Sequence, residues 1–174
     1  VLAADMSLYT GDYRSGERTF QLLTQAAGRA GRGERPGEAV IQTYDPSHYA
    51  IETAAAQDYE AFYEEEIRYR ELMGYPPAEQ LLAVFVSGED EGLLEKGCHY
   101  LKEYILRVIR GLSGREDART GKTGVRTVQP AAAVIGPASP GIDKIKDVYR
   151  RVIYIKAEQY ELLVAMKNRV EKYI

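Results

Sequence analysis

The residues best suited to chemistry in this 174-residue sequence lie between Gln25 and Arg32. Arg29 and Arg32 are three positions apart at the end of an expected helix, so their side chains share one helix face. Gly28 and Gly31 beside them permit the close approach of a ligand or another backbone. Rigidly held guanidinium groups suit a phosphoryl group, and an arginine aimed at a γ-phosphate stabilises transition-state charge. The alternative is a basic helix end that interacts favourably with the helix dipole.

A second group of candidate residues consists of cations near the end of the chain. They follow a turn rich in Gly and Pro at 136–141, and they are Lys144, Lys146, Arg150 and Arg151. Contacts from Lys and Arg to phosphates give affinity for DNA without reading its sequence, and salt weakens them steeply. These four residues predict a DNA-binding surface. The alternative is that they keep the surface soluble.

The charge is distributed unevenly along the chain. The formal net charge is −3 overall, but it is −1 over residues 1–50, −9 over 51–100 and +7 over 101–174. A basic end beside an acidic middle is compatible with nucleic-acid contact on one face, whereas solvated helix faces of unequal sign are the simpler explanation.

The composition predicts a soluble protein with a packed core, since 45% of the residues are hydrophobic and 28% are charged. One cysteine, Cys98, excludes an internal disulfide framework and a multi-cysteine zinc site, and two histidines leave little for a metal centre. No apolar run approaches the roughly 18 residues of a membrane span. We therefore expect a cytoplasmic protein with no metal ligands in this chain and no contact with a membrane.

The first part of the chain predicts the closing part of an α/β domain. Residues 1–5 suggest the end of a buried strand, 16–30 an amphipathic helix and 39–44 a short β-branched strand. A single helix is expected over 47–73, with Ser47 as its cap and the sequence Gly-Tyr-Pro-Pro as its stop.

The rest of the chain predicts an α+β unit. Strands are expected at 81–87, 131–135 and 147–156, helices at 90–112 and 158–174, and a loop at 113–126. The order β-α-β-β-α is that of a split βαβ sandwich, a ferredoxin-like arrangement, without its last strand. The expected fold class is therefore α/β followed by α+β, with the chain cut at both ends.

A wider pattern of residues makes the arginine segment more specific. Gln-x-x-Gly-Arg-x-Gly-Arg at 25–32 matches the sixth motif of superfamily 2 helicases. With its context, the sequence closely resembles the PriA family of replication-restart DNA helicases, also called primosomal protein N′. The segments that carry this resemblance are 3–8, 12–14, 17–33, 42–51, 59–68, 74–77, 136–137, 142–146, 149–150 and 155–156.

The resemblance implies a fold and an activity for the longer protein. It implies an ATP-dependent 3′→5′ DNA helicase that recognises stalled replication forks and restarts replication by primosome assembly. Residues 1–46 would end the second RecA-like lobe, 47–78 would form a linking helix, and 79–174 would form a C-terminal domain similar to ribosomal protein S10. The implied partners are branched and single-stranded DNA, primosome proteins and single-stranded-DNA-binding protein.

The same resemblance implies roles for individual residues. Arg32 would be the arginine finger, Gln25 would couple nucleotide state to lobe closure, and Gly28, Arg29, Gly31 and Arg32 would contact ATP. ATP and Mg²⁺ would be bound mainly by a first lobe outside this chain, and zinc by a cysteine-rich module also outside it.

The chain alone is therefore expected not to hydrolyse ATP. Its one Gly-Lys-Thr, at 121–123, would need a glycine at position 116 to complete a phosphate-binding loop, and Glu116 stands there. The alternative function is a non-catalytic module that docks DNA and protein partners. A ribosomal or RNA-binding protein is disfavoured, because it leaves the segment from Gln25 to Arg32 without a purpose.

Overall fold

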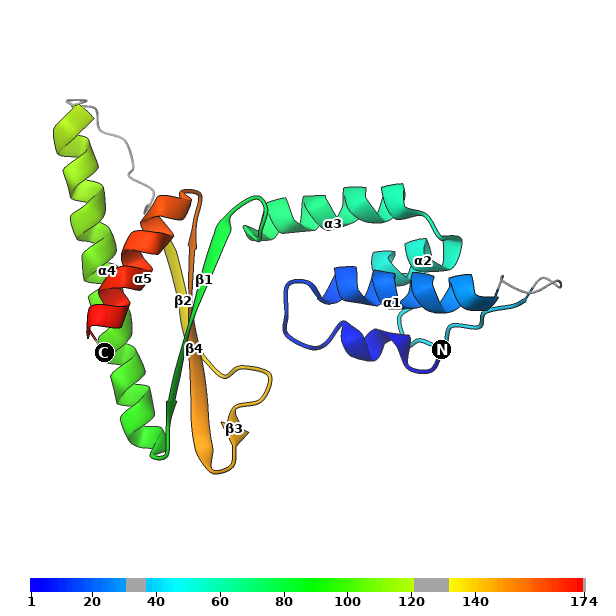
Figure 1. Cartoon of the computed structure of the whole chain (residues 1–174), viewed down its shortest axis with the longest axis horizontal. Coiled ribbons are helices and arrows are strands. Elements are labelled where there is room, and N and C mark those ends of the chain that lie inside the picture. The colour runs from blue at the N-terminus through cyan, green and yellow to red at the C-terminus, as the bar shows by residue number, and fades with distance from the viewer. Residues whose placement is uncertain (31–36, 121–131, 174) are drawn as a thin grey trace. The chain divides into compact units, whose positions relative to one another are not determined.

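The chain is represented by a computed structural model that describes residues 1–30, 37–120 and 132–173, with the backbone alone for 112–120. It divides into two compact units, Val1–Met73 and Gly74–Ile174 (Figure 1). Each unit has its own cluster of buried hydrophobic side chains. No helix in the described part of the chain is long and apolar enough to cross a membrane.

The first unit is built from helices. A 3₁₀ helix, η1 (Ala4–Ser7), precedes α1 (Ser15–Ala30), α2 (Tyr49–Ala56) and α3 (Tyr59–Met73). These elements enclose one core, whose buried members are Ala4, Phe20, Leu23, Ala50, Ile51, Ala54 and Phe62. The predicted helix at 16–30 is confirmed.

The two strands predicted for this unit do not form. Residues 1–5 and 39–44 pass side by side, with hydrogen bonds from the Gln42 amide to the Val1 carbonyl (2.9 Å) and from the Ala4 amide to the Gln42 carbonyl (3.0 Å). Ala3 has a left-handed backbone (φ 50°), which breaks the regular ladder and starts η1 instead. The described residues of this unit therefore contain no strand, and the expected α/β character is not seen in them.

The prediction of one helix over 47–73 is wrong, because the helix is interrupted. Gln57 adopts a left-handed conformation (φ 58°) that ends α2, and the carboxylate of Asp58 accepts a hydrogen bond from the Ala61 amide (3.0 Å) to begin α3. The cap of α2 is His48 rather than Ser47, since His48 Nδ1 accepts from the Ala50 amide (3.2 Å).

The second unit combines an antiparallel sheet with two helices. Its elements are β1 (Gln80–Gly88), α4 (Glu91–Thr120), β2 (Ala133–Ala138), β3 (Lys144–Ile145), β4 (Val148–Ala157) and α5 (Tyr160–Tyr173). The strand order is β1-β4-β2, and β3 pairs with the start of β4. The helix-and-antiparallel-sheet content makes this an α+β fold, as predicted for this part.

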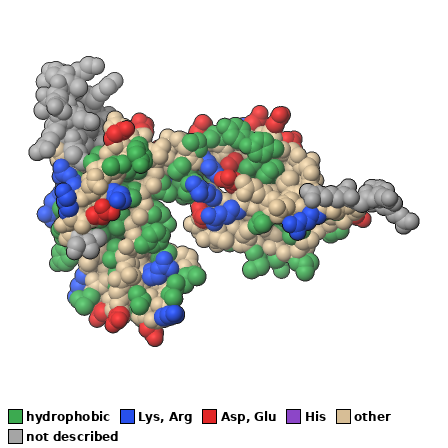
Figure 2. Space-filling view, in the orientation of Figure 1, with side chains coloured by type: hydrophobic (Ala, Val, Ile, Leu, Met, Phe, Trp, Pro, Cys, Tyr) green, Lys and Arg blue, Asp and Glu red, His purple; other side chains and the backbone are tan. Residues whose placement is uncertain are grey.

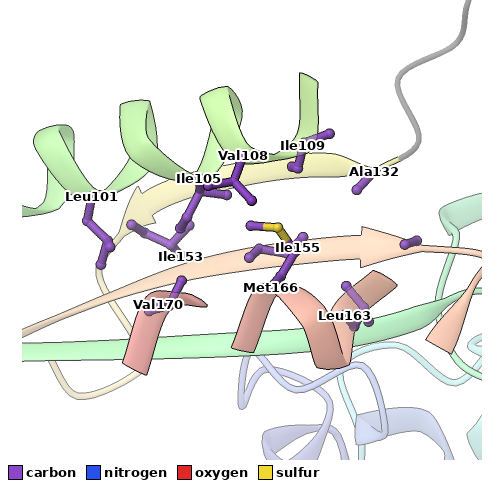
Figure 3. Packing of buried hydrophobic residues seen from close by; sticks show 11 residues of the cluster. Leu101, Ile105, Val108, Ile109, Ala132, Ile153, Ile155, Leu163, Met166 and Val170 are labelled. Carbon is purple, nitrogen blue, oxygen red and sulfur yellow. The ribbon is translucent and has the colours of Figure 1, made fainter. Parts of the chain in front are cut away.

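Both helices cover one face of this sheet. Ile153 and Ile155 of β4 are fully buried, and Figure 3 shows them between side chains from α4 and α5. The helices contribute Leu101, Ile105, Val108 and Ile109 from α4, and Leu163, Met166 and Val170 from α5. Because side chains alternate along a strand, the intervening residues of each strand lie on the opposite face.

The predicted elements of the second unit are largely confirmed, but β2 extends to Ala138, into the segment expected as a turn, and β3 was not predicted. The loop expected over 113–126 is wrong for its first part, since α4 continues to Thr120; the remainder lies outside the described residues. Gly111 and Gly114 suggested an end to the helix, but isolated glycines cost a helix only about 1 kcal/mol each and do not by themselves stop it.

Candidate nucleotide and nucleic-acid sites

Helix α1 has one buried face and one exposed face. Gly16, Thr19, Phe20 and Leu23 are buried and recur with helical spacing, so one stripe faces the core. On the other side Gln25 and Arg29 are exposed, and because they are four residues apart they lie one turn above each other. The fold of this unit therefore presents Gln25 and Arg29 to whatever approaches α1 from outside.

The beginning of α1 is held against α3 by a charged network. Arg70 forms ion pairs with Glu66 (2.7 Å) and Glu17 (2.8 Å), and the Tyr49 hydroxyl donates to Glu66 (2.7 Å). Gly16 leaves room for this network, since a Cβ at this position would lie 2.7 Å from the Tyr49 hydroxyl. Glu66 is only 5% exposed, so its charge depends on these partners.

This network changes the acidity of Tyr49. Burial raises the pKa of the Tyr49 hydroxyl above its ordinary value, and the hydrogen bond and negative charge of Glu66 raise it further. A phenol that donates to a carboxylate keeps its proton, because ionisation would place two negative charges side by side.

The rest of α1 is fixed by aromatic packing and a backbone contact. The ring of Phe20 stacks on that of Phe62 with 4.2 Å between centroids, and Gln57 Nε2 donates to the Thr24 carbonyl (3.3 Å). These contacts come from α3 and from the break between α2 and α3. The interruption at Gln57 thus helps to position the turn that precedes Gln25.

The structure places only part of the predicted nucleotide site. Gln25, Gly28 and Arg29 all lie exposed on the last turns of α1, whereas Gly31 and Arg32 lie outside the described residues. A Cβ on Gly28 would meet no described atom within 4 Å. The described contacts leave the Arg29 side of the helix accessible to a partner.

One buried acid was not singled out from the sequence. Asp5 is 3% exposed; one of its oxygens accepts a long hydrogen bond from the Tyr44 amide (3.4 Å), and the other has no partner among the described atoms. A buried carboxylate oxygen without a partner is energetically costly. The sequence signal was an acid that directly follows the apolar run Val-Leu-Ala-Ala.

The cations near the end of the chain surround a tight hairpin. Lys146 and Asp147 both have positive φ (48° and 64°) and join β3 to β4 in a two-residue turn. Lys144 pairs with Asp147 (3.1 Å) and lies over the ring of Tyr149 (4.6 Å). The hydrogen bond with Asp147 raises the pKa of the exposed Lys144. Lys144 and Lys146 are thus presented at the tip of this hairpin.

Arg150 and Arg151 lie on opposite faces of the sheet. Arg151 is 7% exposed and forms ion pairs with Glu91 and Glu95 of α4, and its hydrogen bonds to Glu95 and then Glu91 raise its pKa. Arg150 lies instead over the ring of Phe85, 5.8 Å from its centroid. The predicted four-residue surface is therefore divided, since the guanidinium of Arg151 is already bound to two carboxylates within the fold.

The sequence has clear relatives among characterised protein families. It is 39% identical over 174 residues to the replication restart protein PriA of Bacillus subtilis, covering 98% of this chain and 19% of that protein. It is 33% identical to the PriA of Synechocystis, in an alignment that covers 99% of this chain and 18% of that protein. It is 47% identical over 89 residues to the PriA of Chlamydia pneumoniae, in an alignment that covers 51% of this chain and 12% of that protein.

No protein-family model matches the chain. The first two relatives nevertheless align with nearly all of it, including the arginine segment of α1 and the α+β unit. The chain spans about a fifth of the length of these relatives. It therefore belongs to the PriA family of replication restart proteins and corresponds to a part of the full-length protein.

Proposed function

We propose that this chain is the part of an ATP-dependent 3′→5′ DNA helicase that supplies the arginine side of a composite ATP site and a DNA-contacting unit. The helicase would act at stalled replication forks and restart replication with primosome proteins. The observation that carries the proposal is the motif on α1, whose described members Gln25 and Arg29 share the exposed face opposite the core.

Features of each unit support the finer assignment of the domains. In the first unit, two hydrogen-bonded extended segments beside α1 are compatible with the edge of a RecA-like lobe. In the second, the order β1-β4-β2 with both helices on one face is what a split βαβ sandwich shows when its last strand is left out. We infer from this an S10-like C-terminal domain.

The nucleotide part of the proposal rests on how an arginine stabilises phosphoryl transfer. A guanidinium lowers the barrier only if it is held rigidly toward the γ-phosphate, and the packing of α1 against the core would supply this rigidity to Arg29. Arg29 and Arg32 would provide the positive charge, and Gln25 on the same exposed face would sense closure of the two lobes. The phosphates and Mg²⁺ would be held mainly by residues outside this chain.

Substitution of the motif arginines in the full-length helicase tests this part. Arg32→Ala is expected to lower DNA-stimulated ATP hydrolysis by about 10³-fold or more, as removal of an arginine finger does. Arg29→Ala is expected to lower it as well. Arg68→Ala is the matched control, because Arg68 is exposed on α3 and pairs with Glu65 of the same helix. Unchanged hydrolysis in Arg32→Ala would contradict the finger assignment.

The DNA-contacting part is supported by the charge of the second unit. Residues 1–73 contain 7 basic and 13 acidic residues, whereas 74–174 contain 16 basic and 13 acidic ones. The unit with the positive balance is the one that presents Lys144 and Lys146 at its hairpin tip and Arg150 on the sheet. Arg151 is not included, since Glu91 and Glu95 hold it.

A salt titration of DNA binding tests which Lys and Arg side chains contact DNA phosphates. The triple variant Lys144→Gln, Lys146→Gln and Arg150→Gln is expected to weaken binding of a forked DNA to this chain and to reduce the slope of log K against log salt by about 2–3. The control is a triple change of the α5 cations Lys167, Arg169 and Lys172 to Gln, for which the slope is expected to stay unchanged. Equal salt slopes for the two triple variants would contradict the proposed DNA-binding surface.

For the chain by itself, the alternative of a non-catalytic docking module for DNA and protein has one observation in its favour. The second unit encloses a core of its own and contains no part of the arginine motif. If the isolated chain binds forked DNA and does not hydrolyse ATP, docking is its own activity and catalysis belongs to the full-length protein. ATP hydrolysis by the isolated chain would overturn this division.

A further inference from the structure

The sheet of the second unit has a face that its two helices do not cover. Leu82, Val84 and Val86 of β1 pack against the helix-side core, so Leu81, Ala83 and Phe85 lie on the other face. By the same alternation, Val152 and Tyr154 of β4 and Ile135 of β2 share this open face. We refer to it as the open sheet face.

The open sheet face carries an exposed aromatic ring on one of its strands. Phe85 is 57% exposed, although it stands in the middle of β1, directly opposite Val152. Tyr154 of β4, which is half-buried, is directly opposite Ala83, so it is the diagonal neighbour of Phe85. Two aromatic side chains thus lie on adjacent strands, within reach of one continuous ligand.

A cation lies over this ring. The guanidinium of Arg150 is 5.8 Å from the centroid of Phe85, and Arg150 follows the hairpin that presents Lys144 and Lys146. The acidic residues of the same hairpin are Asp143 and Asp147, of which Asp147 pairs with Lys144. Figure 2 shows hydrophobic and basic side chains next to each other over the strands of this unit.

The other end of the face is closed by the chain itself. Lys156 is 8% exposed and lies under the ring of Tyr75, with 3.8 Å between Nζ and the ring centroid. Burial lowers the pKa of Lys156, as expected for an ammonium group withdrawn from water. The accessible side chains of the open sheet face are therefore Phe85 and Ile135, which are 57% and 47% exposed, with Arg150 half-buried, whereas Val152 opposite Phe85 is buried.

We propose that Phe85 is a stacking platform for an unpaired base of single-stranded DNA, with Arg150 contacting the adjacent phosphate. This inference rests on the proposed DNA contact of the second unit and extends it by naming the strand state and the residue. An exposed aromatic ring flanked by a guanidinium fits nucleobases, because every base has a π-face and every nucleotide a phosphate. The positive charge beside the ring favours a nucleic acid over an apolar protein surface.

The geometry distinguishes single strands from duplexes. A base can stack on Phe85 only when its own face is free, whereas cations at the hairpin tip contact the phosphates of either form. Loss of the ring should therefore weaken binding to single strands and leave binding to duplexes unchanged. Loss of the tip cations should weaken both.

Affinity measurements with the 174-residue chain test the platform. Phe85→Ala is expected to weaken binding of an oligo-dT by about tenfold, since each stacked base contributes that order of affinity, and to leave a blunt duplex unaffected. Phe85→Leu retains apolar area without a π-system and is expected to behave like Phe85→Ala. Tyr100→Ala is the matched control, because Tyr100 is 70% exposed on α4, and it should bind as the wild type does.

Fluorescence provides a second measurement that does not depend on affinity. The chain contains no tryptophan, so Phe85→Trp places a single reporter on the open sheet face. Its emission is expected to be quenched by oligo-dT and not by a duplex, whereas Tyr100→Trp should respond to neither. Circular dichroism of each variant confirms that the fold is retained.

The outcomes separate this inference from the proposed function. If the wild-type chain binds no DNA, both fail; if it binds DNA but Phe85→Ala and Phe85→Leu bind oligo-dT as tightly as the wild type, only the platform is wrong. If Phe85→Ala instead abolishes self-association seen by sedimentation without changing DNA affinity, the open sheet face is an interface between copies and the platform is again wrong.

Discussion

At the scale of single residues, Glu66 shows how a charge is kept inside the first unit. Its carboxylate accepts from both the Tyr49 hydroxyl and the Arg70 guanidinium, and Arg70 also reaches Glu17 on α1. A buried carboxylate without such partners would be strongly destabilising. The network joins α1, α2 and α3 through side chains, at the end of α1 opposite to the arginine motif.

The shifted pKa of Tyr49 predicts a pH dependence of stability. In the unfolded chain Tyr49 ionises near pH 10, whereas in the folded chain burial and Glu66 keep it protonated to a higher pH. The unfolded state therefore binds fewer protons above pH 10, so the free energy of unfolding falls as the pH rises. Tyr49→Phe is expected to remove up to about 1.4 kcal/mol per pH unit of this fall.

Chemical denaturation followed by circular dichroism between pH 8 and pH 11.5 measures this slope. Tyr44→Phe is the control, since Tyr44 is 92% exposed and should retain the slope of the wild type. If the free energy of unfolding falls with pH equally steeply in Tyr49→Phe and Tyr44→Phe, Tyr49 ionises alike in the folded and unfolded states.

At the scale of elements, β4 decides the character of the second unit. It pairs with β1, β2 and β3, and its alternating side chains supply Ile153 and Ile155 to the core and Arg150 and Tyr154 to the open sheet face. A shift of one residue in its register would exchange the two sets. The core and the proposed DNA contact are therefore two consequences of one register.

Helix α1 contains two glycines with opposite expected responses to substitution. A Cβ at Gly16 would lie 2.7 Å from the Tyr49 hydroxyl and 2.8 Å from a Glu66 oxygen, so Gly16→Ala is expected to lower the free energy of unfolding by about 1–3 kcal/mol. A Cβ at Gly28 would meet no atom of the described residues within 4 Å, so Gly28→Ala is expected to raise the free energy of unfolding by about 0.5–1 kcal/mol. Urea denaturation monitors both; equal stability of the two variants would contradict the packing of α1 on the Tyr49–Glu66 pair.

At the scale of the whole molecule, the chain contains two cores that share no residue. One belongs to Val1–Met73 and the other to Gly74–Ile174, and the negative and positive charge balances divide in the same way. The arginine motif lies in one unit and the proposed DNA-contacting residues in the other. In the proposed helicase, nucleotide and DNA contacts would therefore be made by different parts of the chain.

The sequence by itself predicted what depends on local pattern. Helix α1, the strands β1 and β4 and the order of elements in the second unit follow from apolar periodicity, and the arginine segment follows from its own spacing. The break at Gln57 and the replacement of the first strands by η1 were missed, because left-handed backbones at Gln57 and Ala3 leave no clear trace in composition.

The tertiary structure decided what depends on partners far away in the chain. Arg150 and Arg151 are neighbours in sequence and look alike as DNA ligands, but Arg151 meets Glu95 and Glu91, 56 and 60 residues earlier. Likewise the exposure of Phe85 depends on which face of the sheet the helices cover. The local pattern shows that successive side chains of a strand lie on opposite faces of the sheet. Only the packing of distant elements determines which of these two faces is buried.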